Sequence, residues 1–320
     1  MSTIYFLVQQ MMFFSIPLLV VALGGMFSER SGVVNIALEG IMIMGAFSSI
    51  LFINVMQEAG VNIPPQLLLL LAILIAAAVG IVVSLLHAYA AINMKADQVI
   101  SGTAINMFAP AFAIFAARMI RSVQQIPFSN TFRITKVPVL GDIPVLGPLL
   151  FQNTYITTYL GFAVLAVSAV VLYKTRFGLR LRACGEHPQA ADSVGINVYK
   201  MRYAGVAISG ALAGIGGLVF VIPTSTQFNA TVSGYGFLAL AVLIFGQWKP
   251  ARILFAAFFF GLMMTIASVY SGIPLLNGLG IPSDIYKMVP YAATLVVLAF
   301  TSKNSQAPRA SGVPYDKGSR

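Results

Sequence analysis

The stretch KTRFGLRLRACGEHPQAADSVGINVYKMR, from Lys174 to Arg202, interrupts a chain that otherwise consists mostly of apolar runs of membrane-crossing length. It holds six of the nineteen Lys and Arg residues and two of the nine Asp and Glu residues. Basic residues between two membrane spans resist translocation, so they mark a cytoplasmic loop. The stretch therefore fixes the predicted topology of the whole chain.

Within this loop, HPQAADSVG (His187–Gly195) carries the start and stop signals of a short helix. Pro188 suits the first helical position, and Gly195 suits the left-handed residue just past the end. On the cytoplasmic face of a membrane protein, a short capped helix is more plausible as a docking element than as a simple connector.

The composition is typical of a polytopic membrane protein. Of the 320 residues, 58% are hydrophobic and 9% are charged, whereas a soluble domain carries about 25% charged residues. The net charge of +10 lies mainly in short loops and the tail, and the basic patch of a nucleic-acid binder is absent. We therefore predict an all-α protein of the lipid bilayer that binds no nucleic acid.

A spanning helix needs about 20 apolar residues. Nine apolar runs are candidates for such helices, and two of the nine are short. They are 4–27, 36–55, 67–91, 101–117, 155–173, 201–222, 234–247, 252–270 and 285–300. These runs predict one transmembrane domain over residues 1–300, with about nine to ten spanning helices.

The distribution of basic residues predicts the orientation. If the loop 174–202 is cytoplasmic, alternation of the spans places fourteen of the nineteen Lys and Arg residues inside. The N-terminus is then outside and the C-terminus is cytoplasmic. The five residues left outside are Arg118, Arg121, Arg133, Lys136 and Lys287.

Two polar intervals lie outside the predicted spans. The interval 118–154 is rich in proline and glycine, which predicts an ordered, turn-rich external loop. The interval 301–320 is polar and also contains prolines and glycines, which predicts a disordered cytoplasmic tail.

Two segments depart from a plain hydrophobic helix, namely SGVVNIALEG (Ser31–Gly40) and SGYGFLAL (Ser233–Leu240). Glycine-interrupted segments in the two halves of a transporter can mark broken or re-entrant helices that line the pathway. The same glycines can simply allow close packing of helices. Both interpretations stay open.

Few polar side chains fall within the apolar runs. Glu39 lies one turn inside a span, on the same helical face as Asn35, and an ionisable group in a membrane is a functional candidate by default. A structural carboxylate bonded to backbone near a helix start is the favoured alternative. Asn93 and Asn106 are further candidates for cargo contact or for helix-to-helix hydrogen bonds. Trp248 is interpreted as an anchor at the membrane interface.

Several functional classes lack their motifs. The chain has no G-x-x-x-x-G-K-[ST] loop and no H-E-x-x-H, and its single cysteine is Cys184. We therefore predict no enzyme activity, no cofactor and no metal site. The scarcity of intramembrane ionisable groups argues against an ion-coupled carrier, so the energy for transport must come from elsewhere.

Several motifs resemble one family. ERSGVVNIALEG (Glu29–Gly40), FGLRLRACGEHPQAA (Phe177–Ala191) and SGALAG (Ser209–Gly214) are similar to permease subunits of bacterial ABC importers, in the group of ribose and branched-chain amino-acid permeases. ADQVISGTAIN (Ala96–Asn106) and GFLALA (Gly236–Ala241) resemble its nucleoside (guanosine-type) subgroup.

The resemblance implies a permease subunit of the bacterial cell membrane that forms half of a nucleoside pathway. Implied partners are an ABC ATPase subunit, a second and different permease subunit, and an extracellular substrate-binding lipoprotein. The residues implied in coupling to the ATPase are Gly178, Arg180, Arg182, Gly185, Glu186, Pro188, Ala190, Ala191 and Gly195.

Alternatives remain for some of these assignments. Arg182 could instead contact lipid headgroups. The cargo could be a simple sugar such as ribose, or a branched-chain amino acid. A stand-alone secondary carrier or channel is the alternative from a different class.

Overall fold

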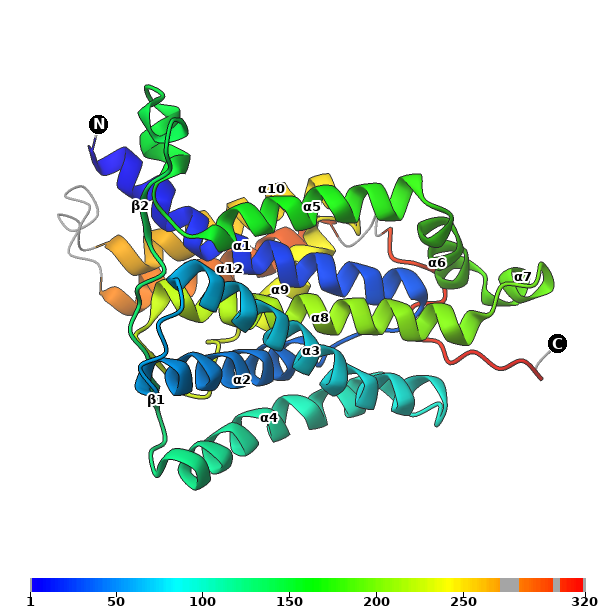
Figure 1. Cartoon of the computed structure of the whole chain (residues 1–320). Helices are drawn as coiled ribbons and strands as arrows, with labels where there is room; N and C mark the ends of the chain where they lie inside the picture. Colours follow the sequence, from blue (N-terminus) through cyan, green and yellow to red (C-terminus); the bar gives the residue numbers. More distant parts are fainter. Residues whose placement is uncertain (1, 271–281, 302–305, 319–320) are drawn as a thin grey trace.

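The computed structural model describes residues 2–270, 282–301 and 306–318, which form an elongated bundle of helices (Figure 1). The helices are α1 Ser2–Ser31, α2 Leu38–Glu58, α3 Pro65–Ile92, α4 Gln98–Arg121, α5 Ile156–Lys174, α6 Arg176–Glu186, α7 Pro188–Ser193, α8 Val198–Thr224, α9 Tyr235–Phe245, α10 Pro250–Val269 and α12 Ser283–Thr301. Every apolar run predicted from the sequence overlaps one of these helices.

Seven helices among the described residues are long and apolar enough to cross a membrane, namely α1, α2, α3, α4, α5, α8 and α10. Helix α9 has only 11 residues, which is about half the length that a membrane span needs. Helix α12 has 19 residues. The polytopic helical fold agrees with the prediction, whereas the count of nine to ten spans is not confirmed.

Helices α1, α2 and α8 form the centre of the bundle, and α4 lies at its periphery (Figure 1). In the apolar 18-residue stretch of α8, 72% of the residues are buried, compared with 17% in that of α4. Small residues make this close packing possible, because a side chain at Gly210 would collide with the backbone of Gly80 on α3 and with Ser84. Small-residue contacts of this kind are typical of helices that associate in a membrane.

One end of the bundle, which we call the hairpin end, carries four short strands. Strand β1 (Ile126–Pro127) pairs antiparallel with β4 (Gln227–Phe228), and β2 (Ile134–Lys136) pairs antiparallel with β3 (Gln152–Thr154). A 3-10 turn (140–142) and a π turn (147–151) lie between β2 and β3. The interval 118–154 is thus ordered and rich in turns as predicted, although its first residues extend α4 to Arg121.

The opposite end, the α7 end, carries α6, α7 and the C-terminal residues 306–318 (Figure 1). The N-terminus lies at the hairpin end and the C-terminus at the α7 end, as the predicted alternation requires.

The prediction of a disordered tail is corrected for residues 306–318; residues 302–305 and 319–320 lie outside the described residues. Ala310 N–H donates to the Gly185 carbonyl at 2.8 Å, and Arg202 Nη1 donates to the Val313 carbonyl at 3.0 Å. Tyr315 is only 4% exposed and packs edge-on against Tyr199. The polar composition suggested disorder, but these few anchors, spaced two or three residues apart, are enough to hold the segment.

Candidate functional site

The chain is broken between α1 and α2, and polar side chains of neighbouring helices hold the exposed backbone of the break. Val34 N–H donates to Gln98 Oε1 at 2.7 Å, and the Val34 carbonyl lies 2.9 Å from His87 Nε2. Asn106 Oδ1 accepts from Gly40 N–H at 2.7 Å, and Asn106 Nδ2 donates to a carbonyl of the break at 2.8 Å. Non-helical backbone at membrane depth persists only with such partners.

Glu39 joins this break to the start of the short helix α9. Its Oε1 accepts from Gly234 N–H at 2.9 Å, and its Oε2 accepts from Gly236 N–H at 2.6 Å. The first N–H groups of a helix have no partner within it, and the helix dipole favours negative charge there. The Glu39 carboxylate therefore satisfies two backbone donors and stabilises the N-terminus of α9.

Close backbone approach explains the glycines of both segments. A side chain at Gly236 would collide with the backbone of Glu39, and one at Gly40 would meet the carbonyl of Ile105 at 2.7 Å. The two glycine-interrupted segments therefore lie against each other, with α4 beside them. We call this cluster the hub, defined as residues 31–40, residues 234–236 and the side chains of α3, α4 and α8 that bond to them.

The four polar residues singled out from the sequence all bond within the chain. Glu39 and Asn106 belong to the hub, and Asn35 Nδ2 donates to Ser209 Oγ of α8 at 2.9 Å. Asn93 lies apart from them, exposed at the α7 end of α3, where its Oδ1 accepts from the Tyr203 hydroxyl. The geometry of Glu39 matches the structural alternative that was favoured for it.

At the other candidate site, the predicted helix 187–195 is confirmed as α7. Pro188 occupies the first helical position and Gly195 has a φ of +84°. The exposed residues of this segment include Gln189, Ala190 and Val194, of which Val194 is 76% exposed. Pro188 and Ala191 were also expected to take part in docking, but both are buried within the chain. Ala191 packs in one cluster with Cys184, Val198 and Tyr315.

Helix α6 carries α7 and is fixed to the bundle at both of its ends. Thr175 caps it by accepting from Gly178 N–H at 3.1 Å. A side chain at Gly178 would collide with carbonyls of α5, and one at Gly185 would collide with the Arg30 carbonyl of α1. Arg180 is exposed, whereas the Arg182 guanidinium lies over the Tyr173 ring at 5.1 Å. The two predicted glycines are therefore points of close contact.

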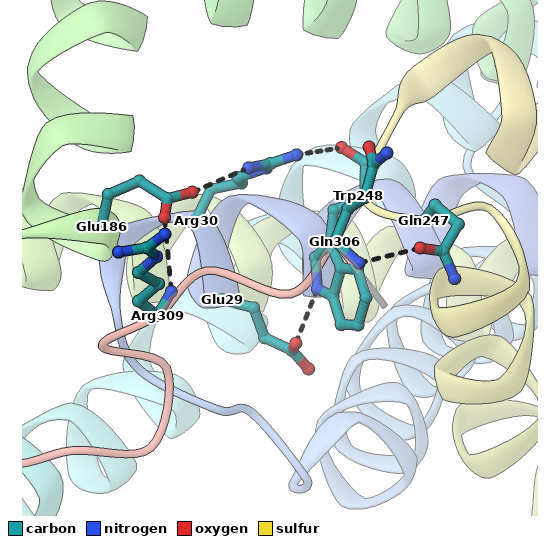
Figure 2. Close-up of polar contacts among 7 residues, drawn as sticks. All are labelled: Glu29, Arg30, Glu186, Gln247, Trp248, Gln306 and Arg309. Atoms are coloured by element: carbon teal, nitrogen blue, oxygen red, sulfur yellow. Dashed lines mark hydrogen bonds and ion pairs between the residues drawn. The ribbon is translucent and has the colours of Figure 1, made fainter. Parts of the chain in front are cut away.

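Figure 2 shows how the last turn of α1 links α6 to the loop after α9. Arg30 contacts Glu186 Oε1 at 3.5 Å through Nη1 and donates to the Trp248 carbonyl at 3.1 Å through Nη2. The Trp248 indole N–H donates to Glu29 Oε2 at 2.6 Å. Trp248 is only 4% exposed, so its interpretation as an interfacial anchor is corrected.

The C-terminal segment completes this cluster (Figure 2). Gln306 N–H donates to Gln247 Oε1 at 2.8 Å, and Arg309 N–H donates to Glu186 Oε2 at 3.4 Å. The sequence analysis identified Glu186 as a candidate, but it did not predict that Trp248 and the C-terminal segment belong to the same cluster. A tryptophan and an acidic residue that each flank an apolar run can form a hydrogen bond, so the residue types were suggestive. The sequence does not show, however, that positions 29 and 248 lie close together.

Cys184 and Asp316, both at the α7 end and outside the spanning helices, have shifted pKa values. Burial raises the pKa of the Cys184 thiol to about 11. The hydrogen bond from Lys95 holds the pKa of Asp316 below its usual value, and the two residues form an ion pair at 2.9 Å. Within the described part of the chain, no three His, Cys, Asp or Glu residues gather as a metal site would require.

Comparison with known proteins gives one consistent result. Residues 7–298 match the family model described as branched-chain amino acid transport system / permease component. The chain is 48% identical to the guanosine ABC transporter permease protein NupQ of Bacillus subtilis, over 96% of this chain and 95% of that protein. It is 41% identical to the nucleoside ABC transporter permease protein NupC of Lactococcus lactis subsp. cremoris, over 99% and 98%.

A more distant relative has a different named cargo. The chain is 30% identical to the putative glucose ABC transporter permease protein of Haloferax volcanii, over 91% of this chain and 90% of that protein. No solved structure matches the chain.

Proposed function

This chain belongs to the family of branched-chain amino acid transport system permease components, and we propose that it is the permease subunit of an ABC importer for nucleosides. The observation that carries the proposal is the near full-length similarity to two nucleoside permeases, one of them named for guanosine. Apolar helices in several passes support a multi-pass membrane protein.

The orientation follows from the basic residues and the position of α7. We place the α7 end in the cytoplasm, because the loop 174–202 and most Lys and Arg residues lie at that end. The hairpin end and the N-terminus are then outside. In this orientation α7 extends away from the bundle toward the cytoplasm (Figure 1).

The partners proposed are those that such a subunit needs. A cytoplasmic ABC ATPase supplies the free energy of ATP hydrolysis, since this chain has no phosphate-binding loop of its own. A second permease subunit, a different chain, completes the pathway, and an extracellular lipoprotein delivers the nucleoside.

The proposed mechanism transmits a push on α7 to the membrane-level helices. Helix α7 is attached to α6, and α6 is fixed to α1 by the Gly185 contact and by the Arg30–Glu186 pair. Arg30 also bonds to the Trp248 carbonyl, just after α9. Displacement of α7 would therefore move α6, the end of α1 and α9 together, as in a rigid-body transition between two discrete states.

Uptake measurements test the cargo. In a strain that lacks this gene, we expect loss of radiolabelled guanosine and adenosine uptake and unchanged ribose uptake. Restoration of guanosine uptake by the cloned gene completes the test. Loss of ribose uptake alone would replace the nucleoside assignment with a sugar importer.

Two matched variants test the docking role of α7. Val194→Asp places a charge on the exposed tip of α7, and Val313→Asp places the same charge on the exposed tail at the same end. In reconstituted importer, we expect V194D to abolish the ATP hydrolysis stimulated by loaded binding protein and V313D to leave it near wild type. Equal stimulation in both variants would exclude docking through α7.

A further inference from the structure

A small cavity lies at the hairpin end, where the chain passes from α8 to α9. It has a volume of about 230 Å³, and its walls include Phe220 and Thr224 of α8 and Phe228 of β4. The connecting segment contributes Asn229, Thr231 and Ser233. Nothing in the comparisons assigns a role to these residues.

The connecting segment 229–234 dips from β4, at the hairpin end, to about the middle of the membrane at the start of α9. Helix α9 has 11 residues, so it rises about 16 Å at 1.5 Å per residue. Its C-terminal end leads directly to Trp248, which bonds to the last turn of α1 at the α7 end. The start of α9 therefore lies about halfway through a hydrocarbon core of about 30 Å.

Polar side chains line this dip and face away from the protein. Asn229, Thr231 and Ser233 are all exposed. The side chains of Asn229 and Ser233 make no hydrogen bond to any described residue. Irregular, polar backbone at membrane depth is tolerated only inside protein or along a water-filled cavity. Lipid is therefore excluded as the neighbour of this segment.

The segment is also held in a strained shape. Ala230 has a φ of +55° and Ser233 a φ of +54°, both in the left-handed region that favours glycine. Such strain persists only where the surroundings fix the chain, and it gathers at functional sites. Here the pairing of β4 with β1 fixes one end, and Glu39 fixes the other through Gly234.

We propose that residues 229–233, with Phe220, Thr224 and Phe228, form this subunit's half of a transient nucleoside site in the translocation pathway. The inference rests on the proposed function and adds to it the residues that the cargo meets. The site offers aromatic edges to a flat base, an amide to the hydrogen-bonding edge of the base, and hydroxyl groups to the ribose. Its volume is below the about 300–1,000 Å³ of complete ligand pockets, as a half-site completed by the second permease would be.

Accessibility to a water-soluble thiol reagent tests whether water reaches the segment. We would introduce Ser233→Cys into the complete importer in proteoliposomes and add a charged methanethiosulfonate reagent. The native Cys184 is buried, and a Cys184→Ser background removes it altogether. We expect rapid labelling at position 233 that saturating guanosine, delivered by the binding protein, slows about tenfold.

The matched control is Leu74→Cys on α3, which is 65% exposed on an apolar surface of the bundle. We expect no labelling there, because a charged reagent does not enter lipid. Absence of labelling at position 233 in the assembled importer would show a dry subunit interface and overturn the proposal. Labelling that guanosine does not slow would show a water-filled space without a nucleoside site, which also overturns it.

Transport kinetics supply the second measurement. Removal of the amide by Asn229→Ala is expected to raise the KM for guanosine uptake about tenfold with little change in maximal rate, equivalent to about 1.4 kcal/mol. Gln125→Ala, which removes an exposed amide elsewhere at the hairpin end, is the control and should leave the KM unchanged. An unchanged KM in N229A would reject the site. Failure of the wild-type importer to carry any nucleoside would instead reject the proposed function.

Discussion

The hub and α7 both lie beside interruptions in long helices, yet their polar groups are used in opposite ways. In the hub, side chains from α3, α4 and α8 pair with the freed backbone, and Glu39 pairs with the start of α9. At α7, the exposed residues point away from the chain. The difference teaches that the freed backbone of the hub is held within this subunit, whereas α7 leaves side chains exposed, as its proposed docking role requires.

The physical reason lies in the surroundings of each interruption. An unpaired N–H or carbonyl group in hydrocarbon costs several kcal/mol, so a break at membrane depth needs partners within the protein. A loop in water needs none, because water satisfies its backbone. A polar group without a partner in the protein therefore costs little free energy at α7, where water binds it, and several kcal/mol in the hub.

Removal of the Glu39 carboxylate should have the largest effect, because it removes a link within the hub on which the stability of the fold depends. Glu39→Ala leaves one buried and one part-buried N–H group unpaired, and each costs about 1–3 kcal/mol, so we expect a loss of about 2–6 kcal/mol in stability. Thermal unfolding in detergent measures it. The control Glu58→Ala removes an exposed carboxylate at the other end of α2, paired with Arg121 at 2.7 Å, and should cost about 0–1 kcal/mol. Equal losses would contradict the structural role of Glu39.

Loss of an anchor in the C-terminal segment should loosen this segment and leave the stability of the helix bundle unchanged. Tyr315→Ala removes its main buried anchor, so the segment should detach more often while the bundle stays folded. We expect trypsin to cleave after Arg309 about tenfold faster or more, since cleavage follows the population of the open form. Val313→Ala, at an exposed side chain of the same segment, should not change the rate. An unchanged rate in Y315A would show that Tyr315 is no anchor.

A smaller effect is expected at the end of α7. Gly195→Ala imposes a left-handed conformation on alanine, at about 1–2 kcal/mol, and should reduce stimulated ATP hydrolysis several-fold. Gly60→Ala is a close match, because Gly60 also has a positive φ (+64°) and open space around it, but it lies at the hairpin end. The two variants should lose similar stability, and only G195A should lose coupling. Loss of coupling in both would indicate a general defect.

The smallest effect concerns Cys184. Its thiolate is the reactive form, and burial raises the thiol pKa to about 11. Labelling by a maleimide should therefore be slow at pH 7 and rise about tenfold per pH unit up to the pKa. Ala190→Cys, on the exposed part of α7, should label rapidly at pH 8. Equal rates at positions 184 and 190 would show that the cluster around Cys184 opens readily.

Much of this protein follows from its sequence. Apolar runs of membrane length have few other stable structures, because only helices satisfy their own backbone in lipid. The start of α7 at Pro188 and its end before Gly195 follow from local chemistry, since proline fits the first helical position and glycine the left-handed one. The family resemblance rested on short motifs, and the similarity to known permeases confirms it.

Other features were decided only by the tertiary structure. The motifs at 29–40, 96–106 and 236–241 looked like separate signatures, and only the fold brings Asn106 and Gly236 to the same break. The partner of Trp248, the order of residues 306–318 and the half-length of α9 depend on contacts between distant positions. The physical reason is that sequence pattern reports local periodicity and burial, whereas a polar group's partner is set by which helices pack together.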